Sequence, residues 1–159
     1  MTEITITINK TDVYDEVSKT TEYEGSKAKD DQEAYERVSV TEEDQLMLER
    51  FWLEACNMIT GLLKPFIKTV SSQDSVKSVD TKKNYVATLE MSSSWDSTLK
   101  DSLQADVFSY FVTSLLAKWS RMANKEDADV LTAEANGFVE SIKSKVWYRK
   151  RPMREKPQI

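Results

Sequence analysis

Residues 41–67, TEEDQLMLERFWLEACNMITGLLKPFI, carry the pattern that decides the fold. The hydroxyl of Thr41 can cap the free amide groups of a first helical turn, and the three acids after it favour the positive end of the helix dipole. Apolar side chains then recur at steps of three and four from Leu48 to Phe66. The spacing predicts a long helix that is buried along a broad face and that Pro65 ends or kinks.

Two further helices are predicted in the C-terminal half. The first runs from about Trp95 to Ala123, with Ser94 or Asp96 as its cap, and its middle is apolar on nearly all sides. A helix of that kind is normally the central member of a bundle. The second begins after Asn124, whose side chain can cap it, and Pro152 closes it or follows just after.

Two segments alternate with the period of two that is typical of strands, TEITITIN at residues 2–9 and YVATLEM at residues 85–91. Their apolar sides consist of Ile4, Ile6 and Ile8 in the first, and of Tyr85, Ala87, Leu89 and Met91 in the second. Two strands alone are marginally stable. We therefore expect them to pair with each other over the helices, or with strands of another copy of the chain.

The segment between the first strand and the first long helix is polar. Residues 10–31 have only isolated apolar points, such as Val13, Tyr14 and Val17, and are interpreted as a long connection or as an arm that lies on something else. A short helix is predicted over residues 28–38, and a serine-rich loop over residues 70–84.

These elements predict a mainly α fold: a three- to four-helix bundle with a small two-stranded β element and extended N- and C-terminal arms. The 159 residues fit a single domain. We divide it into an N-terminal strand and arm (1–38), a helical core that includes a loop and strand at 70–92 (39–148), and a basic C-terminal tail (149–159).

The composition argues against an enzyme. The chain has no histidine, a single cysteine and three glycines that do not cluster, so the commonest general base, a zinc site and a phosphate-binding glycine loop are not expected. Cys56 falls on the apolar stripe and is interpreted as a buried structural thiol. We expect no catalytic residue, metal or cofactor. Because no apolar run approaches the roughly 20 residues that cross a bilayer, we expect a soluble, intracellular protein.

The charge of the chain is concentrated in one segment. Seven basic residues and Glu155 give residues 143–156 a charge of +6. The whole chain has a net charge of −5, so the residues outside this segment carry −11. Three interpretations remain open. The segment is a frayed, solvated end, or it contacts nucleic acid through its cations with Trp147 and Tyr148 stacking on bases, or it docks into an acidic groove of a partner protein. We favour docking.

Two stretches resemble the head-to-tail connector (adaptor) proteins of tailed bacteriophages, SVTEEDQLMLERFWLEACNMITGLLKPFI at 39–67 and QADVFSYFVTSLLAKWSRM at 104–122. In that family the first long helix has an acidic capped turn and a Leu/aromatic-Ala stripe, and the central helix ends in an aromatic residue with an arginine. The residues that match are Thr41, Asp44, Leu48, Trp52 and Ala55 in the first helix, and Trp119 and Arg121 in the central one. The resemblance covers about residues 39–148.

The resemblance implies a structural, non-enzymatic adaptor in the virion neck, assembled in the host cytoplasm. It implies a homo-oligomeric ring of about a dozen copies beneath the portal protein, in contact with other neck or tail proteins, with DNA passing through the lumen. The residues assigned to portal docking are Trp147, Tyr148, Arg149, Lys150, Arg151 and Arg154. Those assigned to strand pairing between subunits are Ile4, Ile6, Ile8, Tyr85, Ala87 and Leu89. The alternative is a small nucleic-acid-binding regulator that acts through its basic tail.

Overall fold

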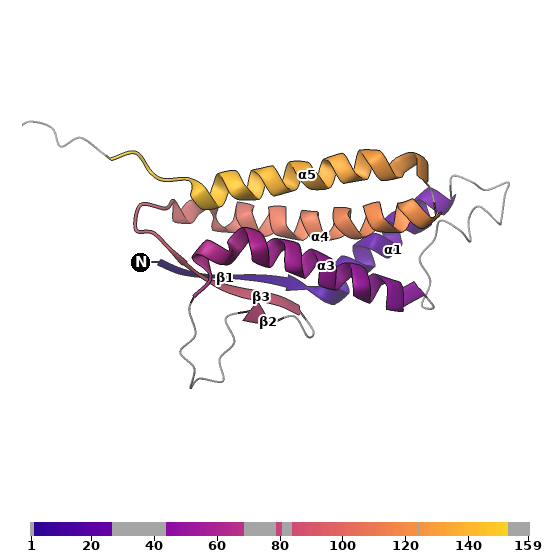
Figure 1. The fold of residues 1–159 in the computed structure, drawn as a ribbon, viewed down its shortest axis with the longest axis horizontal. Helices are drawn as coiled ribbons and strands as arrows, with labels where there is room; N and C mark the ends of the chain where they lie inside the picture. Colours follow the sequence, from indigo (N-terminus) through magenta and orange to yellow (C-terminus); the bar gives the residue numbers. More distant parts are fainter. Residues whose placement is uncertain (1, 27–43, 69–78, 81–83, 124, 153–159) are drawn as a thin grey trace, which may run out of the picture.

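The computed structural model describes residues 2–26, 44–68, 79–80, 84–123 and 125–152. Its strands and helices are listed here in chain order (Figure 1): β1 (Thr2–Asn9), α1 (Lys10–Ser26), α3 (Gln45–Leu63), a 3-10 turn (Lys64–Phe66), β2 (Val79–Asp80), β3 (Asn84–Met91), a second 3-10 turn (Ser97–Leu99), α4 (Lys100–Ala123) and α5 (Lys125–Trp147). This confirms the prediction of a mainly helical bundle with a small β element.

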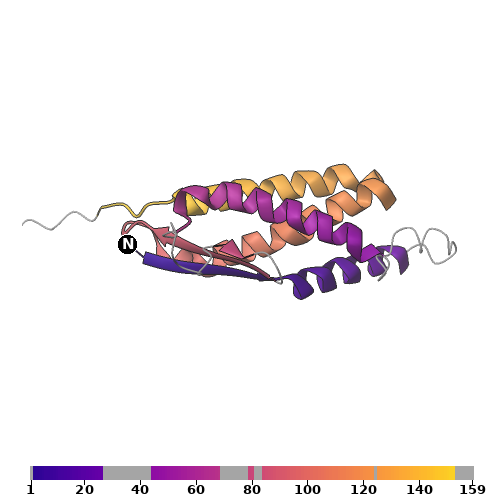
Figure 2. The same ribbon diagram turned by 60° about the horizontal axis from the view of Figure 1, so that its bottom comes forward.

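Helix α4 is the centre of an elongated molecule. It contacts α5, α3, α1 and β1, and it is the helix for which the sequence predicts a central place. Helices α5 and α3 lie along it, the sheet covers one half of its length, and α1 continues from β1 along the other half (Figures 1 and 2). The end of α5, the end of α3 and the start of β1 therefore meet at the same end of the molecule.

The two predicted strands pair with each other within the chain. Strand β1 is antiparallel to β3, and the pairs Ile4 with Leu89, Ile6 with Ala87 and Ile8 with Tyr85 bring together the six residues assigned to contacts between subunits. All six side chains are buried in the core of the single chain. That assignment is therefore corrected: these six residues pair with one another within one copy, which was the first of the two alternatives. The two-residue strand β2 extends the sheet on the other side of β3.

An aromatic cluster fills the core beneath α4. The indole of Trp52 lies 4.7 Å, centroid to centroid, from the ring of Phe111, and Tyr85 packs against the same ring at 5.5 Å. Trp52 and Trp119 are both buried, as is Cys56, which confirms the core positions predicted for them. The apolar stripes of α3 and α4 therefore meet each other and the isoleucine face of β1.

The polar segment after β1 is a helix, which corrects the prediction of an extended connection. The side chain of Asn9 accepts hydrogen bonds from the backbone amides of Thr11 and Asp12 and so caps α1. Over residues 10–21, the part of helix α1 whose burial is described, only Val13, Val17 and Thr21 are buried, and they recur every fourth residue. So narrow a stripe gives a weak signal in the sequence, because most of the stability of such a helix comes from tertiary contacts.

The predicted helix boundaries agree with the structure where it describes them. Asp96 caps the 3-10 turn before α4 by accepting from the amide of Thr98, and α3 gives way to the other 3-10 turn, which contains Pro65. Helix α5 ends at Trp147, ahead of Pro152. The caps predicted at Thr41 and Asn124, the short helix at 28–38 and most of the loop at 70–84 lie outside the described residues.

Candidate functional site

The candidate site is the last residue of α5 and the four residues that follow it, and we call Trp147, Tyr148, Arg149, Lys150 and Arg151 the basic end. It lies at the same end of the molecule as the 3-10 turn after α3 (Figure 1). The ring of Trp147 packs against Phe66 of that turn, with centroids 4.9 Å apart and planes inclined by 66°. The guanidinium carbon of Arg149 lies 6.0 Å from the centroid of the same Phe66 ring. One buried phenyl ring therefore positions two residues of the basic end.

Hydrogen bonds fasten the backbone of the basic end to the turn before α4. The amide of Lys150 donates to the carbonyl of Ser94 at 2.7 Å, and the indole nitrogen of Trp95 donates to the carbonyl of Lys145 at 2.8 Å. The guanidinium of Arg149 donates to the carbonyls of Val146 and Tyr148. The indole of Trp95 and the guanidinium of Arg149 thereby satisfy the carbonyls of Lys145 and Val146, which the last turn of α5 leaves free. As far as Lys150, the described chain is therefore held in place and is not a frayed end.

The basic end turns its charge outward. Lys150 and Arg151 are exposed, and Arg149 is half-buried. Hydrogen bonds from Thr98, followed by the positive charge of Lys150, hold the pKa of Asp96 below its ordinary value. Nearby in sequence to Phe66, Lys68 forms an ion pair with Glu3 at 3.1 Å. Arg154, the sixth residue assigned to docking, lies outside the described residues.

Two aromatic side chains remain open to solvent beside these cations. Trp147 is 57% exposed and Tyr148 is 48% exposed, although tryptophan and tyrosine are usually well buried. Exposed aromatic rings next to arginine are typical of surfaces that bind a partner, because the rings fill pockets and the guanidinium pairs with carboxylates or phosphates. The arrangement is therefore suited to recognising an anionic surface with an apolar pocket.

A second polar cluster joins α4 to α5. The ammonium of Lys145 donates to the hydroxyl of Ser102 at 2.6 Å and to the carboxylate of Asp106, which also accepts from Ser141. Ser102 and Asp106 belong to α4, and Ser141 and Lys145 to α5, so the cluster clamps the two helices together.

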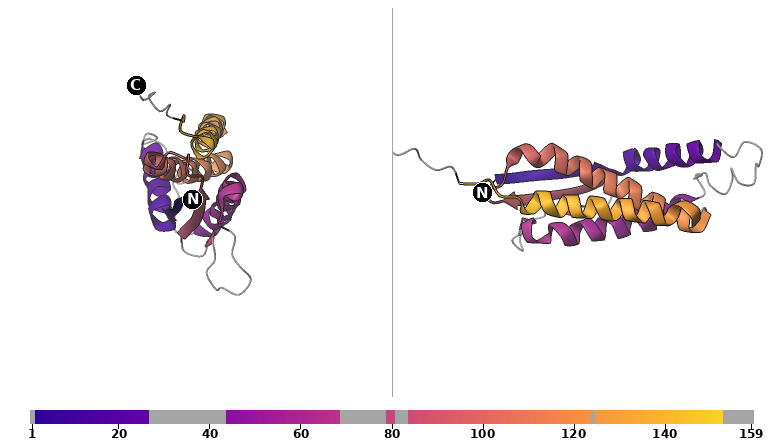
Figure 3. Two further views of the ribbon diagram at one scale, coloured as in Figure 1. Left: turned by 90° about the vertical axis from the view of Figure 1, so that its left-hand side faces the viewer. Right: turned by 90° about the horizontal axis from the view of Figure 1, so that it is seen from above.

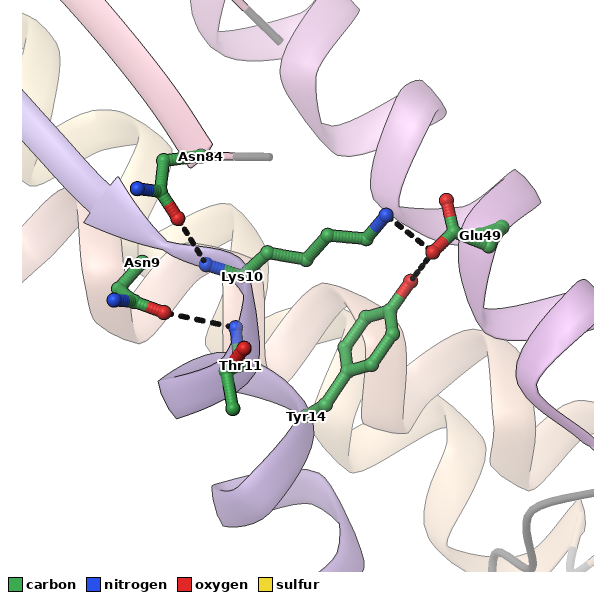
Figure 4. A network of polar contacts seen from close by, with 6 residues as sticks. All are labelled: Asn9, Lys10, Thr11, Tyr14, Glu49 and Asn84. Carbon is green, nitrogen blue, oxygen red and sulfur yellow. Dashed lines mark hydrogen bonds and ion pairs between the residues drawn. The ribbon is translucent and has the colours of Figure 1, made fainter. Parts of the chain in front are cut away.

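A third polar cluster joins α1 to α3 (Figure 4). The hydroxyl of Tyr14 donates to the carboxylate of Glu49 at 3.0 Å, and Lys10 forms an ion pair with the same carboxylate. Burial, and then the hydrogen bond to Glu49, raise the pKa of Tyr14 above its ordinary value.

Burial also raises the pKa of the Cys56 thiol to about 12, so that this thiol is protonated at neutral pH and is a poor nucleophile.

Neither a metal site nor a membrane segment is found in the part of the chain that the structure describes. No three acidic or cysteine side chains there come together as metal ligands. No helix there has both the length and the apolar character needed to cross a bilayer.

Sequence reasoning found the residues of the basic end but not what holds them. Phe66 was placed on the core stripe of the first helix, and Trp95 was read only as part of a helix start. Their contacts with α5 join segments far apart in the chain, for which the sequence gives no periodic signal.

Comparison of the chain with protein-family models, with curated proteins and with solved structures found no match.

Proposed function

We propose that this protein is a structural adaptor of a phage neck. In this proposal about a dozen copies form a ring that joins the portal protein to the tail and lets DNA pass through the lumen. The basic end docks each copy onto the portal. The proposal rests on the resemblance of residues 39–148 to connector proteins, together with the geometry of the basic end.

The observation that carries the proposal is the anchoring of the basic end to the bundle. Its backbone is bound to Ser94 and its first aromatic ring to Phe66, yet Trp147, Tyr148 and Arg151 remain exposed. Holding these side chains in place reduces the conformational entropy that is lost on binding. A partner with acidic residues around an apolar pocket would meet a surface that is already formed.

The distribution of charge also favours this function. The chain outside residues 143–156 carries a net charge of −11, so a lumen lined by it would repel DNA and let it slide. The basic end lies at one end of the elongated molecule, where it can reach a partner without placing its cations along the whole length (Figure 1).

The test is a binding experiment with a candidate portal protein and two charge-matched variants. The first variant combines Lys150→Gln with Arg151→Gln, which leaves the backbone hydrogen bond to Ser94 in place. The control combines Lys19→Gln with Arg50→Gln, exposed cations of α1 and α3. We expect the first variant to lose at least tenfold in portal affinity and the control to bind as the wild type. Equal affinity of all three proteins would contradict docking through the basic end.

The alternative function, a nucleic-acid-binding regulator, is favoured by the two exposed aromatic rings beside Arg151, which have the chemistry for stacking on unpaired bases. Its signature is DNA affinity that falls steeply with salt and is lost in the Lys150→Gln, Arg151→Gln variant. Failure of the protein to shift single- or double-stranded DNA at low salt would exclude the nucleic-acid-binding function.

A further inference from the structure

Helices α3 and α5 both pack on α4 (Figure 3), and residues of all three helices line a groove between α3 and α5. It contains a hollow of about 140 Å³, several times the roughly 30 Å³ that one water molecule occupies. Met58 of α3 forms one wall, Ser114 and Ala117 of α4 lie at the floor, and Ala135 and Val139 of α5 belong to the other wall. The lining also includes Tyr110, Thr132 and Asn136, yet the small Ser114, Ala117 and Ala135 beside Met58 and Val139 leave room for an aliphatic side chain from outside.

Two cations of α4 also line this groove. Lys118 forms an ion pair with Glu54 at 2.6 Å, whereas Arg121 is exposed and has a single, long hydrogen bond of 3.4 Å to Thr132 among the contacts described. The groove therefore suits an occupant that combines an aliphatic side chain with a carboxylate. The basic end of another copy does not fit, because its cations would meet Lys118 and Arg121.

The side of α5 that faces away from the groove has this complementary chemistry. Val130, Ala133, Glu134 and Gly137 recur at i, i+3, i+4 and i+7, the spacing of one helix face, and all four are exposed. Val130 is 66% exposed. A side chain added at Gly137 would meet nothing within 4 Å, so packing within the chain does not explain a residue that weakens a helix interior. Close approach of a second molecule would explain it.

We propose that the groove of one copy binds this face of α5 of a second copy, with Val130 in the hollow and Glu134 against Arg121. The groove and the face are on different sides of the molecule, so the contact is heterologous and repeats from copy to copy until a ring closes. The inference rests on the proposed ring and names the contact between its subunits. It takes the place of the strand pairing that the structure corrects.

The first experiment measures self-association by sedimentation for the wild type, for Arg121→Glu and for Glu134→Arg, each alone and then the two variants mixed. Each variant alone is expected not to assemble, because two like charges then meet at every contact between copies. Mixing them is expected to restore it, because the reversed groove of Arg121→Glu meets the reversed face of Glu134→Arg, and the other contact is the wild-type pair of Arg121 with Glu134. The matched control, Asp15→Arg on the exposed surface of α1, should assemble as the wild type does.

A second experiment detects the contact even where it is weak. Met58→Cys and Val130→Cys, mixed under mild oxidation, are expected to form a cross-linked heterodimer, since Cys56 is buried and does not compete. Mixing Met58→Cys with Leu46→Cys, another exposed residue, should give several-fold less product.

Two results would overturn the inference: no cross-linked product above that control, or mixed charge variants that stay monomeric while the wild type assembles. Neither depends on the portal protein, so portal binding by the basic end is tested independently of this contact.

Discussion

The ring of Trp147 lies 4.9 Å from the ring of Phe66, yet Trp147 is 57% exposed and Phe66 is 6% exposed. The pair therefore joins a core residue to a surface residue. Phe66 belongs to the turn that ends α3, and Trp147 is the last residue of α5. One aromatic contact thus ties the surface that we assign to portal docking to the hydrophobic core.

Removing each member of this pair should have a different effect. Phe66→Ala opens a cavity in the core and is expected to lower the free energy of unfolding by about 3–5 kcal/mol. Trp147→Ala removes a half-exposed ring and should cost about 1 kcal/mol, the usual value of an aromatic pair, while portal affinity falls at least tenfold. Urea denaturation and a pull-down measure the two quantities. Equal destabilisation by both variants would show that Trp147 is a core residue.

Two of the three glycines, Gly61 and Gly137, should both be replaceable by alanine with a gain in stability. Gly61 in α3 and Gly137 in α5 lie inside helices, and a Cβ added at either meets nothing within 4 Å. Each substitution is expected to raise the free energy of unfolding by about 0.5–1 kcal/mol, because alanine is the better helix former. Urea denaturation of Gly61→Ala and Gly137→Ala provides the measurement. A loss of stability in either would mean that the site is more crowded than the described residues indicate.

The indole nitrogen of Trp52 has no hydrogen-bond partner among the described residues, although the side chain is buried. Trp52→Phe removes this unsatisfied donor together with part of the ring. Because the two effects oppose each other, we expect a net change of about 1 kcal/mol or less in the free energy of unfolding, against about 3–5 kcal/mol for Trp52→Ala. A large loss in Trp52→Phe, measured by chemical denaturation, would show that the nitrogen has a partner.

Much of the fold could be predicted from periodic patterns of apolar residues in the sequence. The alternation of Ile4, Ile6 and Ile8 predicted a strand with one buried face, and the crowded apolar middle of α4 predicted its central place. Helix α1 was missed because, over residues 10–21, where burial is described, Val13 and Val17 are the only buried apolar residues, too few to stand out against polar neighbours. The basic end was recognised by its charge and by the aromatic pair of Trp147 and Tyr148. Its anchoring depends on a bond between Lys150 and Ser94 and on the contact with Phe66, and local sequence does not encode such long-range pairs.

Stability should fall at alkaline pH, and the buried thiol should be the first cause. The ordinary pKa of a cysteine is 9.0, and burial raises that of Cys56 to about 12. The folded state thus holds a proton that the unfolded state releases, so this contribution is complete below pH 9 and is lost as the pH rises toward 12. Burial also raises the pKa of Tyr85 from 10.0 to about 12, and that of Tyr14 above its ordinary 10.0, so the tyrosines add their effect above pH 10.

The interval from pH 9 to pH 10 shows the effect of Cys56 most clearly, because the tyrosines, including Tyr110 whose pKa burial also raises, contribute mainly above pH 10. Over it the wild type should lose about 1 kcal/mol more of its free energy of unfolding than Cys56→Ala, which has no thiol to titrate. The free energy of unfolding of each protein is measured by urea denaturation at both pH values. The loss of stability that the smaller alanine side chain causes is the same at both, so it cancels when the changes with pH are compared. Parallel curves for the two proteins would mean that Cys56 ionises as readily in the folded chain as in the unfolded one, and that its burial is not maintained in solution.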